Sequence, residues 1–191
     1  MARKSTYNVQ PFRSETEIDD FLFFLRRTKN SKRDVFLFLF GLNTGLRMSD
    51  IVKLRVGDIN KPEPIITEKK TGKKKRLFLD GIQDIVQEYI KDMNDDDYLF
   101  PSRQGGHITV NTVYKLYIKI GRELGRDDIG CHTLRKTYGR FYYLKTHDIA
   151  TLMYLFNHSS EKITKRYIGI TDDDAKSSLK GFRIGVKGGE M

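Results

Sequence analysis

The amino-acid sequence predicts a mainly α-helical domain with a small antiparallel β-sheet, an α+β fold. Apolar residues recur at helical spacing along most of the chain, polar capping residues precede several of these stretches, and one pair of short strand-like stretches flanks a glycine turn. The 191 residues are enough for one domain with a sizeable core. We expect that domain over residues 11–170, after an N-terminal extension over residues 1–10.

The first predicted helix begins at a capping-box pattern. Ser14 and Glu17 have the spacing with which a serine and a glutamate satisfy each other's free backbone N–H groups. The apolar face that follows consists of Ile18, Phe21, Leu22 and Leu25. This pattern is typical of an amphipathic helix that packs on a core.

The second predicted helix, about residues 32–42, is apolar nearly all round and is expected at the centre of the core. Gly45 ends it, and Ser49 is the expected cap of a short third helix. Arg47 would then lie in the turn between two helices, where its side chain can leave the core and meet a ligand.

Residues 64–70 and 75–79 are the two predicted strands, joined by a turn over residues 71–74. The turn places Lys70 at the exposed end of the hairpin. Further helices are expected at about residues 82–92, 109–124, 133–145, 148–156 and 160–168, with Thr109 and Asp148 as caps. The segment after residue 170 is polar and glycine-containing, and it predicts either disorder or order against a partner.

Several side chains in this pattern suit the transfer of a phosphoryl group. Two guanidiniums, Arg47 and Arg135, can hold the oxygens of a phosphodiester in bidentate geometry without losing their charge. His132 lies three residues before Arg135 and shares its helical face. Tyr167 is a possible nucleophile in such a cationic pocket, and Lys70 on a mobile turn is a possible general acid.

Four segments follow one another in a fixed order: TGLRMSDIVKLRVGDI, KKTGKKKRLFL, HTLRKTYGRFYY and LFNHSSEKITKRY. They resemble the first arginine segment, the lysine hairpin, the second arginine segment and the His-to-Tyr segment of the tyrosine recombinases, the phage integrase family. The likeness spans nearly all of residues 11–170, and Tyr167 follows His158 by nine residues as the family's pattern requires. The chain departs from that pattern at Asn157, Lys136 and Gly139.

The resemblance implies the tyrosine recombinase catalytic domain fold and a site-specific recombinase that cleaves and rejoins DNA through a 3′-phosphotyrosyl intermediate. The six catalytic roles fall on Arg47, Lys70, His132, Arg135, His158 and Tyr167. Asp50 matches an acidic position that organises the first arginine. The implied partners are double-stranded DNA, further copies of the chain on paired DNA sites in a tetrameric synapse, and accessory DNA-bending proteins.

Taken alone, each of these residues can also be explained by an ordinary structural role. Lys69, Lys73, Lys74 and Lys75 compete with Lys70 for the general-acid role. Two other functions stay open. One is relaxation of DNA in the manner of a type IB topoisomerase, and the other is a non-catalytic DNA-binding protein that accompanies a longer recombinase. The chain begins its catalytic pattern almost at once, so it resembles a stand-alone catalytic domain.

Composition agrees with a polyanionic partner. Thirty-five Lys and Arg residues against 25 Asp and Glu residues give a net charge of +10. The single Cys131 excludes an internal disulfide framework and suits a reducing cytoplasm. No apolar run reaches transmembrane length. His132 and His158 lack further ligands at metal-binding spacing, so we expect neither a metal nor a cofactor.

Overall fold

The structure, a computed structural model of the chain, describes residues 9–184. Most of the predicted N-terminal extension and the last part of the predicted tail lie outside these residues. The helices are α1 (Glu15–Leu25), α2 (Ser31–Thr44), α3 (Met48–Ile51), α4 (Val56–Ile59), α5 (Gln83–Ile90), α6 (Val110–Glu123), α7 (Thr133–Thr146), α8 (Ile149–Phe156), α9 (Glu161–Ile168) and α10 (Asp172–Ser178). Strands β1 (Ile65–Thr67) and β2 (Lys74–Arg76) form one two-stranded sheet, and a 3-10 helix, η2, spans Asp80–Ile82.

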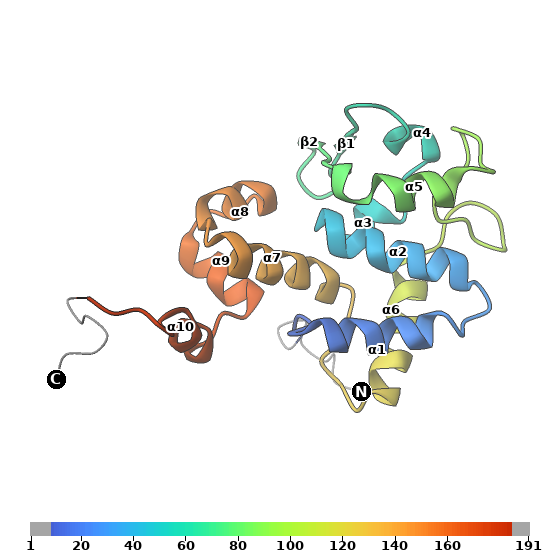
Figure 1. Cartoon of the computed structure of the whole chain (residues 1–191). Helices are drawn as coiled ribbons and strands as arrows, with labels where there is room; N and C mark the ends of the chain where they lie inside the picture. The colour runs from blue at the N-terminus through green and yellow to red at the C-terminus, as the bar shows by residue number, and fades with distance from the viewer. Residues whose placement is uncertain (1–8, 185–191) are drawn as a thin grey trace.

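Helix α2 lies at the centre of the main core, as its all-round apolar sequence predicts (Figure 1). The Phe38 ring stacks on Phe21 of α1 with centroids 5.0 Å apart, and Phe36 stacks on Tyr89 of α5 at 3.9 Å. These four side chains are buried. Burial of such large apolar surfaces on both sides of α2 fixes the helices that surround it.

Helix α7 joins the main core to a second, smaller cluster. It packs on α2, and it also packs against α8 and α9, which lie beyond the main body in Figure 1. The second cluster centres on Leu152, Phe156 and Ile168, all fully buried. We call the part of the molecule that contains the main core the main body, and the boundary between it and the α7–α9 unit the seam. Residues from both parts of the chain therefore line the seam.

The hairpin is shorter than the sequence predicts. Its register pairs Ile65 with Arg76 and Thr67 with Lys74, so the antiparallel pairing stops at residue 76. Leu77 and Leu79 were predicted as strand residues, but both side chains are buried in the main core. Leu77 N still donates to Pro64 O at 2.8 Å. Beyond this bond the chain packs on the core and enters η2, so tertiary contacts override the local strand pattern.

Several predicted caps are confirmed. The side chains of Ser14, Thr109 and Asp148 accept hydrogen bonds from the backbone at the starts of α1, α6 and α8. The predicted cap at Ser49 is wrong: α3 begins at Met48, and Arg47 occupies the N-cap position with an extended backbone. Arg47 still lies in the turn after α2, where Gly45 adopts a left-handed conformation with φ of 58°.

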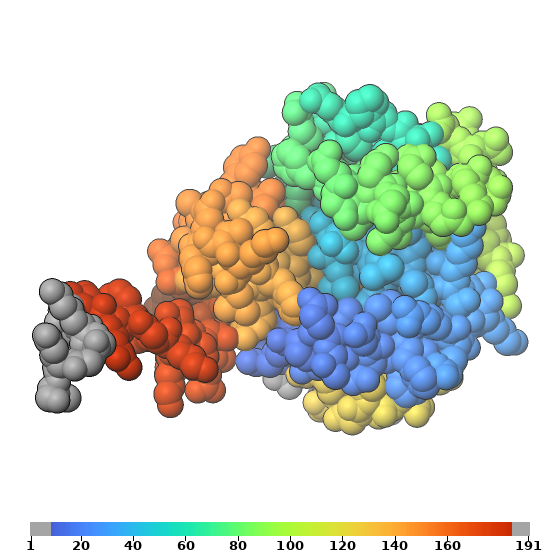
Figure 2. All heavy atoms as spheres, viewed as in Figure 1, coloured from blue at the N-terminus to red at the C-terminus, as the bar shows by residue number. Residues whose placement is uncertain are grey.

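The segment after Ile168 contains a helix that the sequence pattern did not predict. A capping box between Thr171 and Asp174 begins α10. The carboxylate of Asp174 also binds the guanidinium of Arg140 on α7, with two contacts of 2.9 and 2.5 Å. Arg140 donates a further hydrogen bond to the carbonyl of Gly169, 2.9 Å away. The ion pair attaches α10 to α7, and the bond to Gly169 attaches α7 to the end of α9. Residues 172–184 project from the rest of the molecule in Figure 2.

None of the helices in the described part of the chain is both long and apolar enough to cross a membrane.

Gly139 offers a test of the packing between α7 and its two neighbours. A Cβ atom at this position would lie 2.7 Å from Ile168 Cγ2 and 2.7 Å from Phe156 Cε2. We expect Gly139→Val to lower the free energy of unfolding by about 1–3 kcal/mol, measured by urea denaturation, because the cluster has no room for the added methyl groups. Gly81→Ala is the control, since no atom lies within 4 Å of a Cβ built there. Wild-type stability of Gly139→Val would show that the second cluster is loosely packed.

Candidate active site

The two predicted arginines lie on opposite sides of the seam. Arg47, at the start of α3, comes from the main body, and its Nη1 donates to Glu68 Oε1 at 2.8 Å. Arg135, on α7, is 2% exposed and donates to two main-chain carbonyls. The acceptors are Gly45 O at 2.6 Å and Phe156 O at 3.1 Å. Arg135 thus touches the turn that holds Arg47 and the end of α8.

The guanidinium of Arg135 also lies over the ring of Phe156, 4.2 Å from its centroid. Main-chain carbonyls carry no net charge, so these contacts fix the orientation of Arg135 without neutralising it. The charge stays available for an anion that enters the seam.

Tyr167, on α9, directs its hydroxyl toward the first turn of α7. Its Oη lies 3.2 Å from His132 Nδ1. Burial raises the pKa of the Tyr167 phenol, while the charges of Arg135 and Arg47 act in the opposite direction. Partial burial of the His132 ring lowers its pKa, and the charge of Arg135 lowers it further. A neutral imidazole beside a protonated phenol is the arrangement that a general base and a nucleophile require.

His158 packs against the ring of Tyr167. Its ring is perpendicular to that of Tyr167, with centroids 5.1 Å apart. His158 Nδ1 lies 3.1 Å from the hydroxyl of Thr164, which is fully buried on α9. Burial lowers the pKa of His158, and the charges of Arg135 and Arg47 add to this effect. His158 therefore holds the Tyr167 ring in place and keeps its second ring nitrogen for a ligand.

Three lysines of the hairpin differ in their surroundings. Lys70 lies in the hairpin turn with an exposed side chain. Lys75, on β2, extends toward α8, where its Nζ donates to Leu155 O at 3.2 Å. Burial lowers the pKa of Lys75 to about 8, with the charge of Arg135 as the next cause. Lys73 also contacts this helix end, through a 2.9 Å hydrogen bond to Asn157 Oδ1. The hairpin and α8 thus line one cleft, which also includes Glu68 and His158.

Two carboxylates connect the hairpin to the turn around Arg47. Asp50 Oδ1 accepts the backbone N–H of Lys69 at 2.9 Å. Asp50 was expected to organise Arg47, yet the Arg47 side chain is bound by Glu68 instead. Glu68 did not emerge from the sequence as a site residue. The available signal was its alternation with Pro64 and Ile66, because a charge in phase with two buried positions of a strand requires a partner.

The arrangement brings five of the six predicted residues together. Lys70 is exposed in the hairpin turn, and its charge is among those that lower the pKa of His132. Among the described residues, no group of three or more His, Cys, Asp or Glu side chains is placed to hold a metal ion. The charges of Arg135 and Arg47 act on both imidazoles and on the phenol of Tyr167, so the five groups form one cluster. Such a set can bind a phosphodiester and transfer it to an oxygen nucleophile.

Comparisons with known proteins point to one family. A family model described as the phage integrase family matches residues 12–173. The probable integrase/recombinase YoeC of Bacillus subtilis is 43% identical over 177 residues, which cover 91% of this chain and 97% of YoeC. The tyrosine recombinase XerC of Staphylococcus epidermidis is 26% identical over 155 residues, covering 77% of this chain and 52% of XerC. The chain therefore spans about half the length of that longer relative.

Solved structures share the fold. The XerA recombinase superposes with a TM-score of 0.72 at 18% identity, covering 93% of this chain and 66% of XerA. A λ integrase fragment, crystallised as a dimer bound to a COC′ core site, gives a TM-score of 0.66 at 17% identity, covering 88% of this chain and 62% of the fragment. With a family model that matches residues 12–173 and a relative 43% identical along nearly its whole length, this chain belongs to the phage integrase family of tyrosine recombinases.

Proposed function

We propose that the protein is a site-specific DNA recombinase that cleaves and rejoins double-stranded DNA through a 3′-phosphotyrosyl intermediate. The observation that carries the proposal is the placement of the Tyr167 hydroxyl 3.2 Å from His132 Nδ1, where the positive charges of both arginines act on the phenol. The relatives named as recombinases and the net charge of +10 support the same substrate. A DNA substrate also implies that the protein acts at the nucleoid, in the cytoplasm.

In the proposed reaction the oxygen of Tyr167 attacks the scissile phosphorus, and the P–O5′ bond breaks. His132 accepts the phenolic proton. Arg47 and Arg135 bind the non-bridging oxygens, whose negative charge grows in the transition state. A lysine donates a proton to the departing 5′ oxygen, and His158 completes the cradle around the phosphate. Attack by a 5′ hydroxyl of the partner strand reverses these steps and rejoins the DNA.

The proposed catalytic unit is residues 11–170, and it acts as an assembly. We infer that copies of the chain associate on paired DNA sites as a tetramer, with DNA-bending proteins as accessories. Leu179, Phe182 and Ile184 after α10 are 61%, 66% and 81% exposed, and they are the apolar groups that a neighbouring copy would cover.

Tyr167→Phe tests the nucleophile, because the change removes one oxygen and keeps the ring packed between its neighbours. We expect no covalent protein–DNA adduct on a nicked suicide duplex that carries the flanking repeats of the native locus, with DNA affinity within about threefold of wild type. Tyr154→Phe is the matched control, since Tyr154 on α8 is 82% exposed. An adduct with Tyr167→Phe that is lost with Tyr154→Phe would mean that the nucleophile is the other tyrosine.

Lys70→Ala and Lys75→Ala test the general acid on two substrates. We propose Lys70 for this role, since an exposed side chain in the turn can follow the DNA backbone, whereas Lys75 is bound to the end of α8. Loss of the acid should slow cleavage by about 10²- to 10⁴-fold. A substrate with sulfur in place of the bridging 5′ oxygen should restore the rate, because a thiolate with a pKa of about 8.5 leaves without a proton. Sulfur rescue of Lys75→Ala and not of Lys70→Ala would transfer the role to Lys75.

Deletion of residues 179–191 tests assembly and keeps α10 with its Arg140–Asp174 pair. We expect the truncated protein to bind and cleave a single site but to form no paired-site complex, with recombination lost, because the apolar groups that would dock are gone. Substitution of Leu179, Phe182 and Ile184 by Ser in the full chain should give the same result. Wild-type recombination by both proteins would exclude docking of this segment. Relaxation of supercoiled DNA that lacks paired sites would favour the topoisomerase alternative.

A further inference from the structure

Glu68 is a buried carboxylate in a site whose substrate is an anion. It follows β1 directly and is 4% exposed. Among the positive groups that act on it are Arg47 and Lys75. Burial raises the pKa of Glu68, but the hydrogen bond from Thr71 and the charge of Arg47 outweigh this effect and lower it below its ordinary value. The side chain is therefore ionised at neutral pH. A buried charge is retained only where its partners offset the loss of water.

Both carboxylate oxygens of Glu68 have a partner. Oε1 accepts from Arg47 Nη1 at 2.8 Å, and Oε2 accepts from the hydroxyl of Thr71 at 2.8 Å. The main chain of Glu68 closes the hairpin turn, through bonds of 2.9 Å to Lys73 O and from Gly72 N. One residue therefore links the Arg47 guanidinium to the turn that carries Lys70.

Glu68 leaves most of Arg47 free to bind substrate. A guanidinium has five N–H donors, and in the described part of the chain one side-chain hydrogen bond, to Glu68, occupies Arg47. The free arginine side chain has about 2 kcal/mol of rotamer entropy, which binding of a phosphate would have to overcome. Because the Glu68 carboxylate already binds one nitrogen of the guanidinium, it reduces this entropy cost and directs the remaining N–H donors into the seam.

We propose that Glu68 is a positioning residue for DNA cleavage, which orients the guanidinium of Arg47 and joins it to the lysine-bearing turn. The inference rests on the proposed function and deepens it. Asp50 supports the same link from the other side, because it binds the backbone of Lys69 in that turn at 2.9 Å. The two carboxylates make the arginine and the hairpin one unit.

Single-turnover cleavage of the suicide duplex tests the role of Glu68. We expect Glu68→Ala to slow cleavage by about 10- to 100-fold, with DNA affinity within about threefold of wild type, because Arg47 is present but poorly oriented. Glu68→Gln keeps the shape and an accepting oxygen, so it should retain more activity than Glu68→Ala. The bridging-sulfur substrate should leave most of the loss in both variants, since the main defect lies in the orientation of Arg47 and not in protonation of the leaving group.

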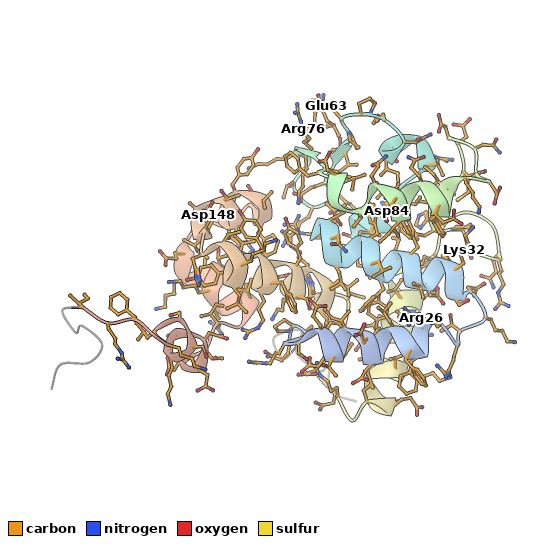
Figure 3. The ribbon with its side chains drawn as sticks, viewed as in Figure 1. Arg26, Lys32, Glu63, Arg76, Asp84 and Asp148 are labelled. Carbon is orange, nitrogen blue, oxygen red and sulfur yellow. The ribbon has the colours of Figure 1, made fainter. Side chains whose placement is uncertain are left out.

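A double-mutant cycle with Arg47→Lys separates positioning from a general structural effect. If Glu68 acts through Arg47, the double variant Glu68→Ala/Arg47→Lys should cleave at the rate of Arg47→Lys alone. Glu63→Ala is the matched control on the same hairpin. Glu63 pairs with Arg76 at the outer edge of the hairpin, and Figure 3 shows the two side chains close together. The side chain of Glu63 is 65% exposed and that of Arg76 is 51% exposed. Its removal should leave cleavage unchanged.

Three results would overturn the proposal: cleavage by Glu68→Ala at the wild-type rate, faster cleavage, or additive losses in the double variant. Thermal melting checks that each variant folds. If Glu68→Ala does not fold, the near-isosteric Glu68→Gln is used for the test instead. An NMR measurement of Arg47 guanidinium rotation in the DNA-free protein is independent of activity. We expect slow rotation in wild type and fast rotation in Glu68→Ala. A wild-type protein that forms no adduct would refute the proposed function, whereas fast rotation in wild type would refute the role of Glu68.

Discussion

The burial of the Arg135 guanidinium is the constraint on which the rest of the site depends. An ionised group withdrawn from water costs several kcal/mol unless its donors are satisfied. Arg135 meets this requirement with the carbonyls of Gly45 and Phe156, which belong to the main body and to the end of α8. The same two hydrogen bonds therefore hold the seam together and keep a fixed positive charge within it. The packing of the seam and the proposed binding of a phosphate thus depend on one side chain.

Geometry around Arg135 explains why the other groups converge. Gly45 is left-handed at the end of α2, and Arg47 follows two residues later at the start of α3. Phe156 ends α8, and its ring contacts both Tyr167 and His158. Because Arg135 binds both of these points, it brings the first arginine, the second histidine and the tyrosine close to one another. The ion pair between Arg140 and Asp174 adds a further fixed point just beyond Tyr167.

The positive charges of the two arginines are neutralised to different extents. Glu68 and Asp50 lie on the side of Arg47 and the hairpin, whereas Arg135 is held by neutral carbonyls. Partial burial of their rings lowers the pKa of both His132 and His158, and the positive charge of Arg135 lowers it further. A neutral His132 is able to accept a proton from Tyr167 at neutral pH. The distribution of charge thus supports the proposed roles of His132 as the base and of the two arginines as the groups that bind the phosphate.

Local sequence determined much of this protein. Some features depend only on residues close together in sequence, so their patterns are visible in the chain. They are the apolar face of α1, the all-round apolar surface of α2 and the side-chain caps at Ser14, Thr109 and Asp148. The order and spacing of the arginine, histidine and tyrosine segments likewise indicated the family. These features depend on neighbours in sequence or on motifs that the chain carries intact.

Tertiary structure decided what depends on residues far apart. The hairpin ends early because Leu77 and Leu79 enter the core, and α10 is fixed by Asp174 binding Arg140, 34 residues away. The pairing of Glu68 with Arg47 and the approach of Lys75 to α8 join segments separated by 21 and 80 residues. No local pattern contains such contacts, because a buried charge selects its partner by proximity in the folded chain and not by distance along the sequence.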